Sequence, residues 1–286
     1  MTLRQALDGA ARQLGTQGED DGRGEAEQLL GRLLACSRAE LYLRGGEPFD
    51  TGTARTLALW ILRRRGGEPL QSIVGEAAYR DLVLEVGPGV FIPRPETELL
   101  VEHARAFLLS LGRPQLRVLE CGTGSGAIAL ALASELPDIV VVATELSPRA
   151  LAYANRNRGR LLPAAAARVH LVQGDLVSPV RGPFDALLSN PPYIAEFERA
   201  ELPRDVLDHE PHLALFAARD GMAVIERLVD DGARVVAPGG LLALELGSGQ
   251  GDTALALLAT DPRWTGGRVE RDLAGRARML LARRAH

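Results

Sequence analysis

Apolar side chains recur at helical spacing over the first part of the chain, up to about residue 70. These stripes occupy residues 3–14, 29–34 and 57–61. Such a spacing is typical of amphipathic helices that bury one face. Capping-box pairs accompany the pattern, Thr2 with Gln5 and Ser37 with Glu40. We therefore predict that residues 1–75 form a small helical bundle.

The hydrophobic period shortens to two residues after the bundle, as expected for strands. Apolar residues recur at every second position, Leu82, Leu84 and Val86, and a Gly-Pro-Gly turn follows at residues 87–89. Residues 90–92 are apolar again. We therefore predict a β-hairpin, with one arm on each side of this turn, as the linker over residues 76–93.

Helical and strand patterns alternate from residue 94 to the end of the chain. Helical patterns lie at residues 95–111, 125–136 and 222–236, and after Ser147-Pro148. Strand patterns lie at residues 116–120, 139–144, 168–172, 184–189 and 241–246, and a final antiparallel pair at 268–272 and 278–283. The alternation predicts an α/β fold with a Rossmann-like, doubly wound and mostly parallel sheet. Such a sheet binds its ligand at the carboxyl ends of its strands.

The composition is that of a folded protein with a sizeable core, since 46% of residues are hydrophobic and 24% are charged. Aromatic residues make up only 4%, which argues against a base-stacking platform for single-stranded nucleic acid. The formal net charge is −4, from 33 basic and 37 acidic residues. This balance lacks the positive excess of a duplex-DNA binder.

The number of cysteines and the lengths of the apolar runs indicate in which cellular compartment the chain is expected to work. Cys36 and Cys121 are too few for a disulfide framework, and no Cys and His residues have metal-ligand spacing, so no metal is expected. The N-terminus lacks the apolar stretch of a signal peptide. No apolar run approaches the roughly 18 residues of a membrane span. We expect a cytoplasmic protein with no membrane partner.

Candidate chemistry first appears at the glycine-rich segment over residues 119–126. Its candidate cofactor-binding residues are Glu120, Gly122, Thr123, Gly124, Ser125 and Gly126. Glycines allow a sharp turn and close approach of a ligand, and the start of the next helix presents free N–H groups. Glu120, at the strand end, suits the amino group of an amino-acid-like ligand. A tight strand-to-helix turn without a ligand is the alternative.

A second candidate position is Glu145, at the end of the strand after the glycines. A carboxylate there can accept hydrogen bonds from both hydroxyls of a ribose. This feature indicates adenosine more than any one reaction, and a solvated Glu at a strand end is the alternative. After the third strand pattern, Asp175 and Leu176 are expected to border the adenine, although Asp175 could instead cap a turn.

The third position is the sequence Asn190-Pro191-Pro192-Tyr193, directly after an apolar strand. Two prolines cannot continue a strand and fix a rigid turn without N–H groups. The Asn190 side chain and the Pro191 carbonyl are then free to accept hydrogen bonds from one substrate nitrogen, and Tyr193 can lie flat against a planar group. The arrangement suits a planar NH₂, either a carboxamide or the exocyclic amine of a base. Asn190, Pro191 and Tyr193 are the predicted catalytic residues.

Together, the glycine turn, Glu145 and the NPPY sequence resemble class I methyltransferases that depend on S-adenosyl-L-methionine (SAM). The sequence Phe91-Ile92-Pro93-Arg94-Pro95-Glu96-Thr97-Glu98 resembles the signature of the bacterial release factor glutamine methyltransferases (the PrmC/HemK family). Further matches are at residues 71–75, 210–211, 214–215, 220–221, 239–240 and 272–275. The resemblance covers about residues 68–280, and the helical part before them matches the family in kind.

This resemblance implies the reaction, the cofactor and the partner. The expected activity is transfer of the SAM methyl group to the side-chain nitrogen of the glutamine in the GGQ motif of peptide chain release factors, leaving S-adenosyl-L-homocysteine. Asn190 would contact both SAM and substrate. Phe91, Pro93 and Arg94 would bind the substrate with Asn190, Pro191, Pro192 and Tyr193. The alternative for Phe91 and Pro93 is that they only pack the hairpin against the sheet. The expected domains are a helical bundle for substrate docking (1–75), the hairpin linker (76–93) and the methyltransferase domain (94–286).

Several alternatives stay open at the level of sequence. The bundle could serve stability or oligomerisation instead of docking. NPPY also suits an adenine amino-methyltransferase, whose flipped base would need a positively charged approach surface that the acidic balance does not favour. A non-catalytic adenosine-binding module is a further alternative, and other proteins with glutamine in a Gly-rich loop could be substrates.

Overall fold

The computed structural model of the chain describes residues 1–15, 21–272 and 274–286. Leu273, part of the 272–275 motif, lies outside the described residues. The chain divides into two compact units, which are described separately. The first comprises Met1–Glu76 with Pro203–His209, and the second comprises Ala77–Leu202 with Glu210–His286.

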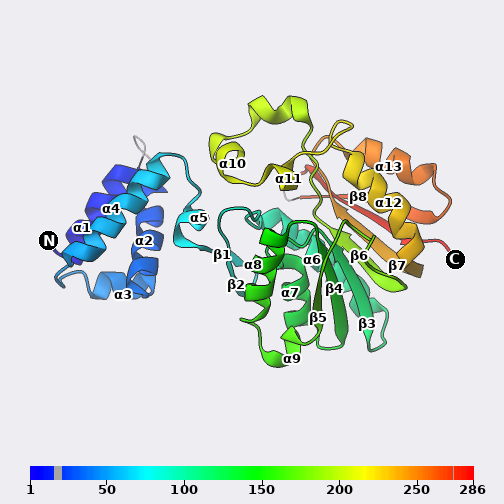
Figure 1. Cartoon of the computed structure of the whole chain (residues 1–286), viewed down its shortest axis with the longest axis horizontal. Coiled ribbons are helices and arrows are strands. Elements are labelled where there is room, and N and C mark those ends of the chain that lie inside the picture. Colours follow the sequence, from blue (N-terminus) through cyan, green and yellow to red (C-terminus); the bar gives the residue numbers. More distant parts are fainter. Residues whose placement is uncertain (16–20, 273) are drawn as a thin grey trace. The chain divides into compact units, whose positions relative to one another are not determined.

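The first unit is helical, as its apolar stripes predict (Figure 1). Its helices are α1 (Leu3–Leu14), α2 (Asp21–Leu34), α3 (Arg38–Leu43), α4 (Thr51–Arg65), α5 (Leu70–Val74) and α10 (Arg204–His209). Both predicted capping boxes are confirmed: Thr2 caps α1 through Gln5, and Ser37 caps α3 through Glu40. Leu7 of α1 and Leu30 of α2 are buried in the common core, so the amphipathic stripes pack against each other.

The second unit contains the predicted sheet of mostly parallel strands. Its strands are β3 (Leu116–Cys121), β4 (Ile139–Glu145), β5 (Val169–Gln173), β6 (Phe184–Ser189), β7 (Val236–Glu245), β8 (Trp264–Arg271) and β9 (Ala277–Arg284). Their order is β5-β4-β3-β6-β7-β9-β8. The first five of these are parallel, and β9 pairs antiparallel with both β7 and β8, as predicted. The α/β class with an antiparallel C-terminal pair is therefore confirmed.

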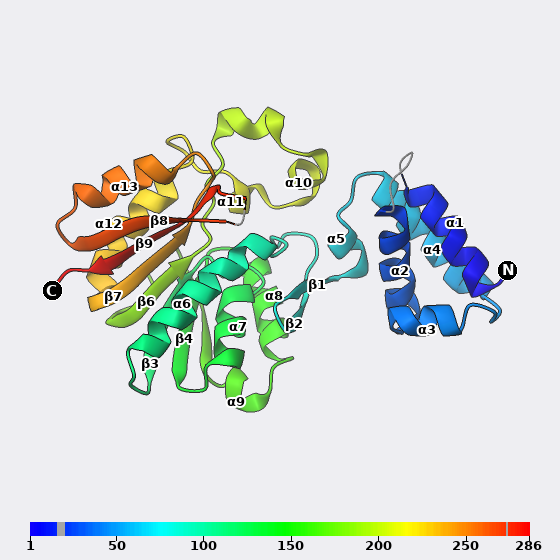
Figure 2. The same cartoon turned by 180° about the vertical axis from the view of Figure 1, so that it is seen from behind.

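Helices cover both faces of this sheet. α6 (Glu98–Ser110) and α7 (Ala127–Glu135) share one core with Val118, whereas α12 (Ala223–Val235) and α13 (Gly251–Ala259) share another with Leu119. Successive strand residues point to opposite faces, so β3 contributes to both cores. Figure 2 shows α12 and α13 beside β7, β8 and β9. The remaining helical segments are η1 (Pro95–Thr97), α8 (Pro148–Arg158), α9 (Pro163–Ala166), η2 (Glu196–Glu201) and α11 (His212–Leu215).

The predicted arms of the hairpin are wrong. The two-stranded sheet pairs β1 (Glu76–Tyr79) with β2 (Leu82–Glu85), so the turn lies at Arg80-Asp81 and the 90–92 segment is not a strand. Arg80 adopts a positive φ of 51°, which glycine usually supplies. Its guanidinium forms ion pairs with Glu102 of α6 and Glu135 of α7. These ion pairs hold a turn that contains no glycine, which is why the sequence pattern did not predict it.

The strand order places a topological switch point between β3 and β6. From β3 the chain adds β4 and β5 on one side, and then crosses to add β6 and β7 on the other. In open α/β sheets the ligand binds at such a switch point, at the carboxyl ends of the strands. None of the helices within the described residues has the length and apolarity to cross a membrane.

Candidate active site

The residues singled out from sequence gather at the carboxyl end of the sheet in the second unit. Pairing of β3 with both β4 and β6 aligns Glu120 with Ala143 and Leu188. The glycine turn follows β3, Glu145 ends β4, and NPPY follows β6. The Ser189 hydroxyl donates to the Cys121 carbonyl at 2.7 Å, which joins the last residues of β6 and β3. The predicted motifs are thus on neighbouring strand ends.

The glycine turn has the backbone that only glycine adopts readily. Gly122, Gly124 and Gly126 have φ values of 72°, 57° and 90°. A Cβ on Gly122 or Gly124 would have no atom within 4 Å, so this side of the turn is open. By contrast, a Cβ on Gly126 would lie 2.9 Å from Leu130 Cδ1 of α7, so Gly126 is needed for packing. The three glycines therefore have two different roles.

Asn157 of α8, which the sequence analysis did not identify, forms a hydrogen bond with the backbone of this turn. Its side-chain NH₂ donates to the Ser125 carbonyl at 2.9 Å, and its Oδ1 accepts from the Glu85 N–H at 2.6 Å. Asn157 is 1% exposed. A buried polar residue on a helix is the signal that could have found it, because such a group needs hydrogen-bond partners.

Glu120 is 1% exposed at the end of β3. Its Oε2 accepts from the Thr123 hydroxyl at 2.7 Å and from the Ala129 N–H at 3.0 Å. Its Oε1 is buried and has no hydrogen-bond partner among the described residues. Burial is the main reason that the pKa of Glu120 is raised to about 7. A cationic group at Oε1 would satisfy the orphaned oxygen.

Glu145 is held by backbone N–H groups on both of its oxygens. Gly124 N–H donates to Oε2 and Ser147 N–H donates to Oε1, each at 2.8 Å. Ser147 also caps α8, accepting from the Ala150 N–H at 3.2 Å. A carboxylate has about four lone-pair positions, so each oxygen retains the capacity to accept one more hydrogen bond. The clamp fixes the carboxylate beside the glycine turn.

Asp175 and Leu176 lie in the loop after β5. This loop meets the end of β4, since the Gly174 N–H donates to the Glu145 carbonyl at 3.0 Å. Asp175 forms an ion pair with Arg227 of α12 at 2.7 Å, and both side chains are nearly half exposed. Leu176 is partly buried against the α12 core and has a φ of 47°. Both residues are thus close in the fold to Glu145.

NPPY leaves β6 in a backbone held by several other segments. The Ile194 N–H donates to the Leu215 carbonyl at 2.9 Å, and the Tyr193 carbonyl accepts from the Gln250 side chain at 2.8 Å. Gly221, with a φ of 82°, lies so close that a Cβ there would be 2.0 Å from the Tyr193 oxygen. The corner is therefore fixed from outside as well as by its own prolines.

Glu245 is a functional candidate that the sequence analysis did not identify, and it contacts Thr97 of the 91–98 signature. Glu245 ends β7 and is 2% exposed. The Thr97 hydroxyl donates to Glu245 Oε2 at 2.7 Å, and the Asn190 side-chain NH₂ donates to Thr97 Oγ1 at 3.0 Å. The Tyr193 hydroxyl donates to Glu245 Oε1 at 3.3 Å. An acid at the end of an apolar strand is the signal that could have identified Glu245.

Phe91, Pro93 and Arg94 precede η1 and are partly buried. The Arg94 guanidinium lies over the Phe91 ring, 5.1 Å from its centroid, and forms an ion pair with Glu210. A buried carboxylate thus fixes an arginine that stacks on an aromatic ring. This contact holds the start of residues 93–98 (PRPETE) in place.

The fold and the site define the class of protein. A family described as "Methyltransferase small domain" matches residues 88–208, and "PrmC N-terminal domain" matches residues 5–75. A solved methyltransferase from Pyrococcus furiosus has a similar fold, with a TM-score of 0.51 and 21% identity over 79% of this chain and 96% of its own. The second unit is a class I methyltransferase domain.

Relatives of known name define the family more closely. A release factor glutamine methyltransferase from Moorella thermoacetica is 43% identical over 286 residues, which is 99% of each chain. Another, from Gloeobacter violaceus, is 40% identical over 98% of this chain and 97% of its own. The chain belongs to the release factor glutamine methyltransferase family, as the resemblance predicts.

Proposed function

We propose that this chain transfers the methyl group of SAM to the side-chain amide nitrogen of the glutamine in the GGQ motif of release factors. The observation that carries the proposal is the Asn190-Pro191 corner at the end of β6, next to the glycine turn after β3. Membership of the family supports the substrate. The cytoplasm, where release factors act, is the proposed location.

The residues around the glycine turn fit SAM. The open side of Gly122 and Gly124 leaves room for close approach of a ligand. The orphaned Glu120 Oε1 suits an ammonium group, and the clamped Glu145 carboxylate suits a ribose diol. Thr123 and Ser125 complete the proposed turn, and Asp175 and Leu176 would border the adenine. When bound, SAM supplies a methyl group carried by a positively charged sulfur.

Asn190 and Pro191 would act on the substrate nitrogen. An amide nitrogen is a poor nucleophile because its lone pair is delocalised into the carbonyl. The Asn190 Oδ1 and the Pro191 carbonyl would accept the two amide hydrogens and hold the nitrogen in one direction. Both bonds strengthen as positive charge develops on nitrogen, which stabilises the transition state. Fixing the direction of approach contributes up to about 7–11 kcal/mol in favourable cases.

Aromatic and proline side chains would form the walls around the glutamine. Tyr193, anchored on Glu245, would lie against the flat amide, and Pro192 would stiffen the backbone that precedes it. Phe91 and Pro93 would form the opposite wall. Arg94 would hold Phe91 through the stacking contact and its ion pair with Glu210.

The helical bundle of residues 1–75 is proposed to dock the protein substrate. Its helices α1 to α5 form a hydrophobic core of their own. Leu59 and Leu62 of α4 are 61% and 63% exposed. A free peptide that carries GGQ would then have a higher KM than the intact release factor.

The proposed function is tested by incubating the protein with labelled SAM and a release factor, and by locating the methyl group with mass spectrometry. We expect the label on the GGQ glutamine, and we expect it to be lost when that glutamine is replaced by alanine. Label that persists on the altered release factor would refute the substrate. Absence of methyl transfer to any substrate would leave a non-catalytic adenosine-binding module as the better description.

A further inference from the structure

Three residues from distant parts of the second unit form one hydrogen-bond chain that ends at the predicted catalytic asparagine. Glu245 ends β7, Thr97 closes η1, and Asn190 follows β6. The Thr97 hydroxyl donates to Glu245 Oε2 at 2.7 Å, and the Asn190 Nδ2 donates to Thr97 Oγ1 at 3.0 Å. Glu245 and Thr97 are 2% and 3% exposed, so water does not replace these bonds.

The chemistry of the groups fixes the direction of every bond in this chain. An ionised carboxylate only accepts hydrogen bonds, and a threonine hydroxyl has a single proton to donate. Because Thr97 gives its proton to Glu245, it can only accept from Asn190. The Asn190 amide must therefore turn its NH₂ towards Thr97. Its Oδ1 is then left to face the other way.

We propose that Glu245 and Thr97 are positioning residues that set which end of the Asn190 amide meets the substrate. The inference rests on the proposed function, in which Asn190 Oδ1 accepts a hydrogen from the substrate amide. If the Asn190 amide were reversed, its NH₂ would face the substrate NH₂, and two donors would oppose each other. The relay from Glu245 through Thr97 prevents that reversal.

The same carboxyl group also holds the aromatic wall. Its second oxygen, Oε1, accepts from the Tyr193 hydroxyl at 3.3 Å. One buried Glu245 thus orients both ends of the NPPY sequence, Asn190 through Thr97 and Tyr193 directly. A substitution that removes the charge and keeps the shape therefore tests the direction of the bonds separately from packing.

The ionisation of Glu245 gives the relay a pH dependence. Burial, with a smaller effect of Glu96 in η1, raises the pKa of Glu245, whereas Thr97, Arg278 of β9 and the Tyr193 hydroxyl lower it; the result is about 7. A protonated carboxyl group could donate to Thr97, which would then be free to donate to Asn190 Oδ1 and reverse the amide. At saturating SAM, kcat should therefore rise with pH through about 7, as Glu245 loses its proton.

The test uses the full-length chain and compares Glu245→Gln and Thr97→Val with Thr97→Ser. The amide introduced by Glu245→Gln presents both a donor and an acceptor, so it no longer fixes the direction of its bond with the Thr97 hydroxyl. Thr97→Val removes that hydroxyl and breaks the relay. We therefore expect kcat with a release factor to fall about 10- to 100-fold in both variants. Thr97→Ser keeps the hydroxyl and should recover most of the activity. The dissociation constant for SAM should change by less than about twofold in each, since neither Glu245 nor Thr97 is among the residues proposed to bind SAM.

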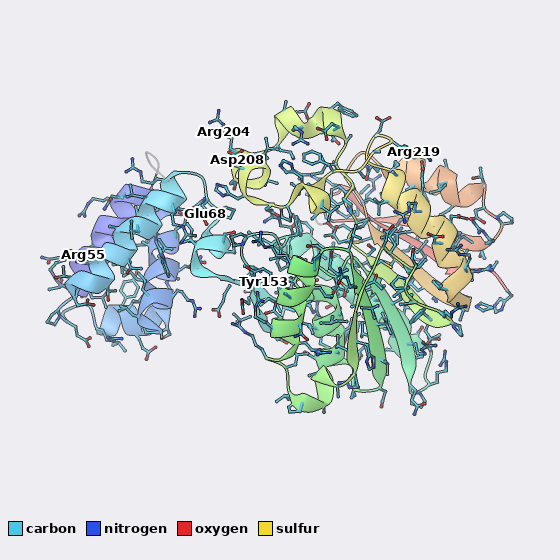
Figure 3. All side chains as sticks on the ribbon, viewed as in Figure 1. Arg55, Glu68, Tyr153, Arg204, Asp208 and Arg219 are labelled. Atoms are coloured by element: carbon cyan, nitrogen blue, oxygen red, sulfur yellow. The ribbon has the colours of Figure 1, made fainter. Side chains whose placement is uncertain are left out.

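A matched control is Glu226→Gln in α12, whose carboxylate pairs with Arg219. Arg219 is labelled in Figure 3. It should leave kcat unchanged. The dependence of kcat on pH separates the relay from a purely structural role, which would not change it. The rise in kcat near pH 7 should disappear in Glu245→Gln and persist in Glu226→Gln.

The outcomes separate the relay from the proposed function. If the wild-type chain methylates the GGQ glutamine and both relay variants keep full kcat and an unchanged pH profile, the relay is refuted and the proposed function stands. If Thr97→Ser is as impaired as Thr97→Val, the hydroxyl is not the group that matters, and the relay is also refuted. A wild-type chain that methylates no release factor overturns the proposed function and the relay with it.

Discussion

The carboxyl group of Glu120 is buried beneath the glycine turn with one oxygen unpaired among the described residues. Burying a charge with incomplete hydrogen bonding is unfavourable, so the folded chain retains this proton to a higher pH than the unfolded chain. Ionisation of Glu120 is therefore unfavourable in the folded chain. It should lower the free energy of unfolding by an amount that can be measured.

We predict that Glu120 makes the free energy of unfolding fall as pH rises from about 4.5 to about 7. The pKa of Glu120 is raised from its ordinary 4.5 to about 7, so the folded state binds more protons than the unfolded state in this window. In Glu120→Gln, which cannot ionise, the decline should be smaller. Urea denaturation at a series of pH values checks this.

The control for that measurement is again Glu226→Gln, because its carboxylate pairs with Arg219 and lies away from the glycine turn, on α12. Its pH dependence should match that of the wild type. Equal slopes for Glu120→Gln and the wild type would show that Glu120 ionises normally in the folded chain.

Replacing Asn190 by alanine removes the side-chain acceptor proposed to hold the substrate amide. Loss of one such preorganised group costs roughly 100-fold or more in turnover. We expect this loss in methyl transfer to a release factor, with only a modest change in SAM affinity by calorimetry. The matched control is Asn155→Ala on α8, whose side chain accepts from Arg158 on the surface. Unchanged turnover in Asn190→Ala would remove this residue from the mechanism.

At the scale of elements, the NPPY corner depends on segments that follow it by many residues. Gly221 precedes α12, and Gln250 precedes α13, yet both meet the Tyr193 carbonyl. The prolines prevent the segment from continuing β6 as a strand. Its final direction is then set by these neighbours. At Gly221 there is no room for a side chain, because an added Cβ would overlap the Tyr193 oxygen.

We predict that Gly221→Ala disturbs the corner more than an ordinary glycine substitution would. A positive φ costs a non-glycine residue about 1–2 kcal/mol, and here the added Cβ would also lie 2.0 Å from the Tyr193 oxygen. Both stability in urea and methyl transfer should fall. Gly112→Ala is the control, since Gly112 has a φ of 60° and no atom within 4 Å of the added Cβ. Equal losses in the two variants would show that the contact with Tyr193 is unimportant.

At the scale of the whole molecule, charge argues against nucleic acid as the substrate. The formal net charge is −4, whereas binding to a phosphate backbone is driven by a positive surface that releases counterions. Membership of the release factor glutamine methyltransferase family points the same way. Adenine in a nucleic acid has a suitable planar amine, but this chain lacks the positive net charge that would attract a nucleic acid.

We therefore predict that an excess of duplex DNA or structured RNA inhibits methylation of a release factor by less than about twofold, even at low salt. The measurement is the rate of label transfer with and without the polyanion at two salt concentrations. Strong inhibition that weakens steeply as salt is added would indicate a nucleic-acid surface and would revive the alternative substrate.

Local sequence determined the helices, most strands and the three motifs of this protein. Capping boxes and the glycines of the turn after β3 act within a few residues of themselves, so their effects can be predicted without the rest of the chain. The two prolines likewise end β6 locally. The same reasoning failed at Arg80, where ion pairs with Glu102 and Glu135 hold a turn that the local residues do not announce. Because the turn lies at Arg80-Asp81, the observed hairpin spans residues 76–85 and not the predicted arms around residues 87–89.

Only the tertiary structure decided which side chains meet beneath the motifs. Thr97 and Glu245 are separated by 148 residues along the chain and join because β7 and η1 meet at the same end of the sheet. Nothing in the local pattern of either segment specifies that partner. Long-range strand order and burial select it, since a buried carboxyl group must find donors wherever the fold brings them. The sequence thus established the family and its motifs, and packing established the network that orients them.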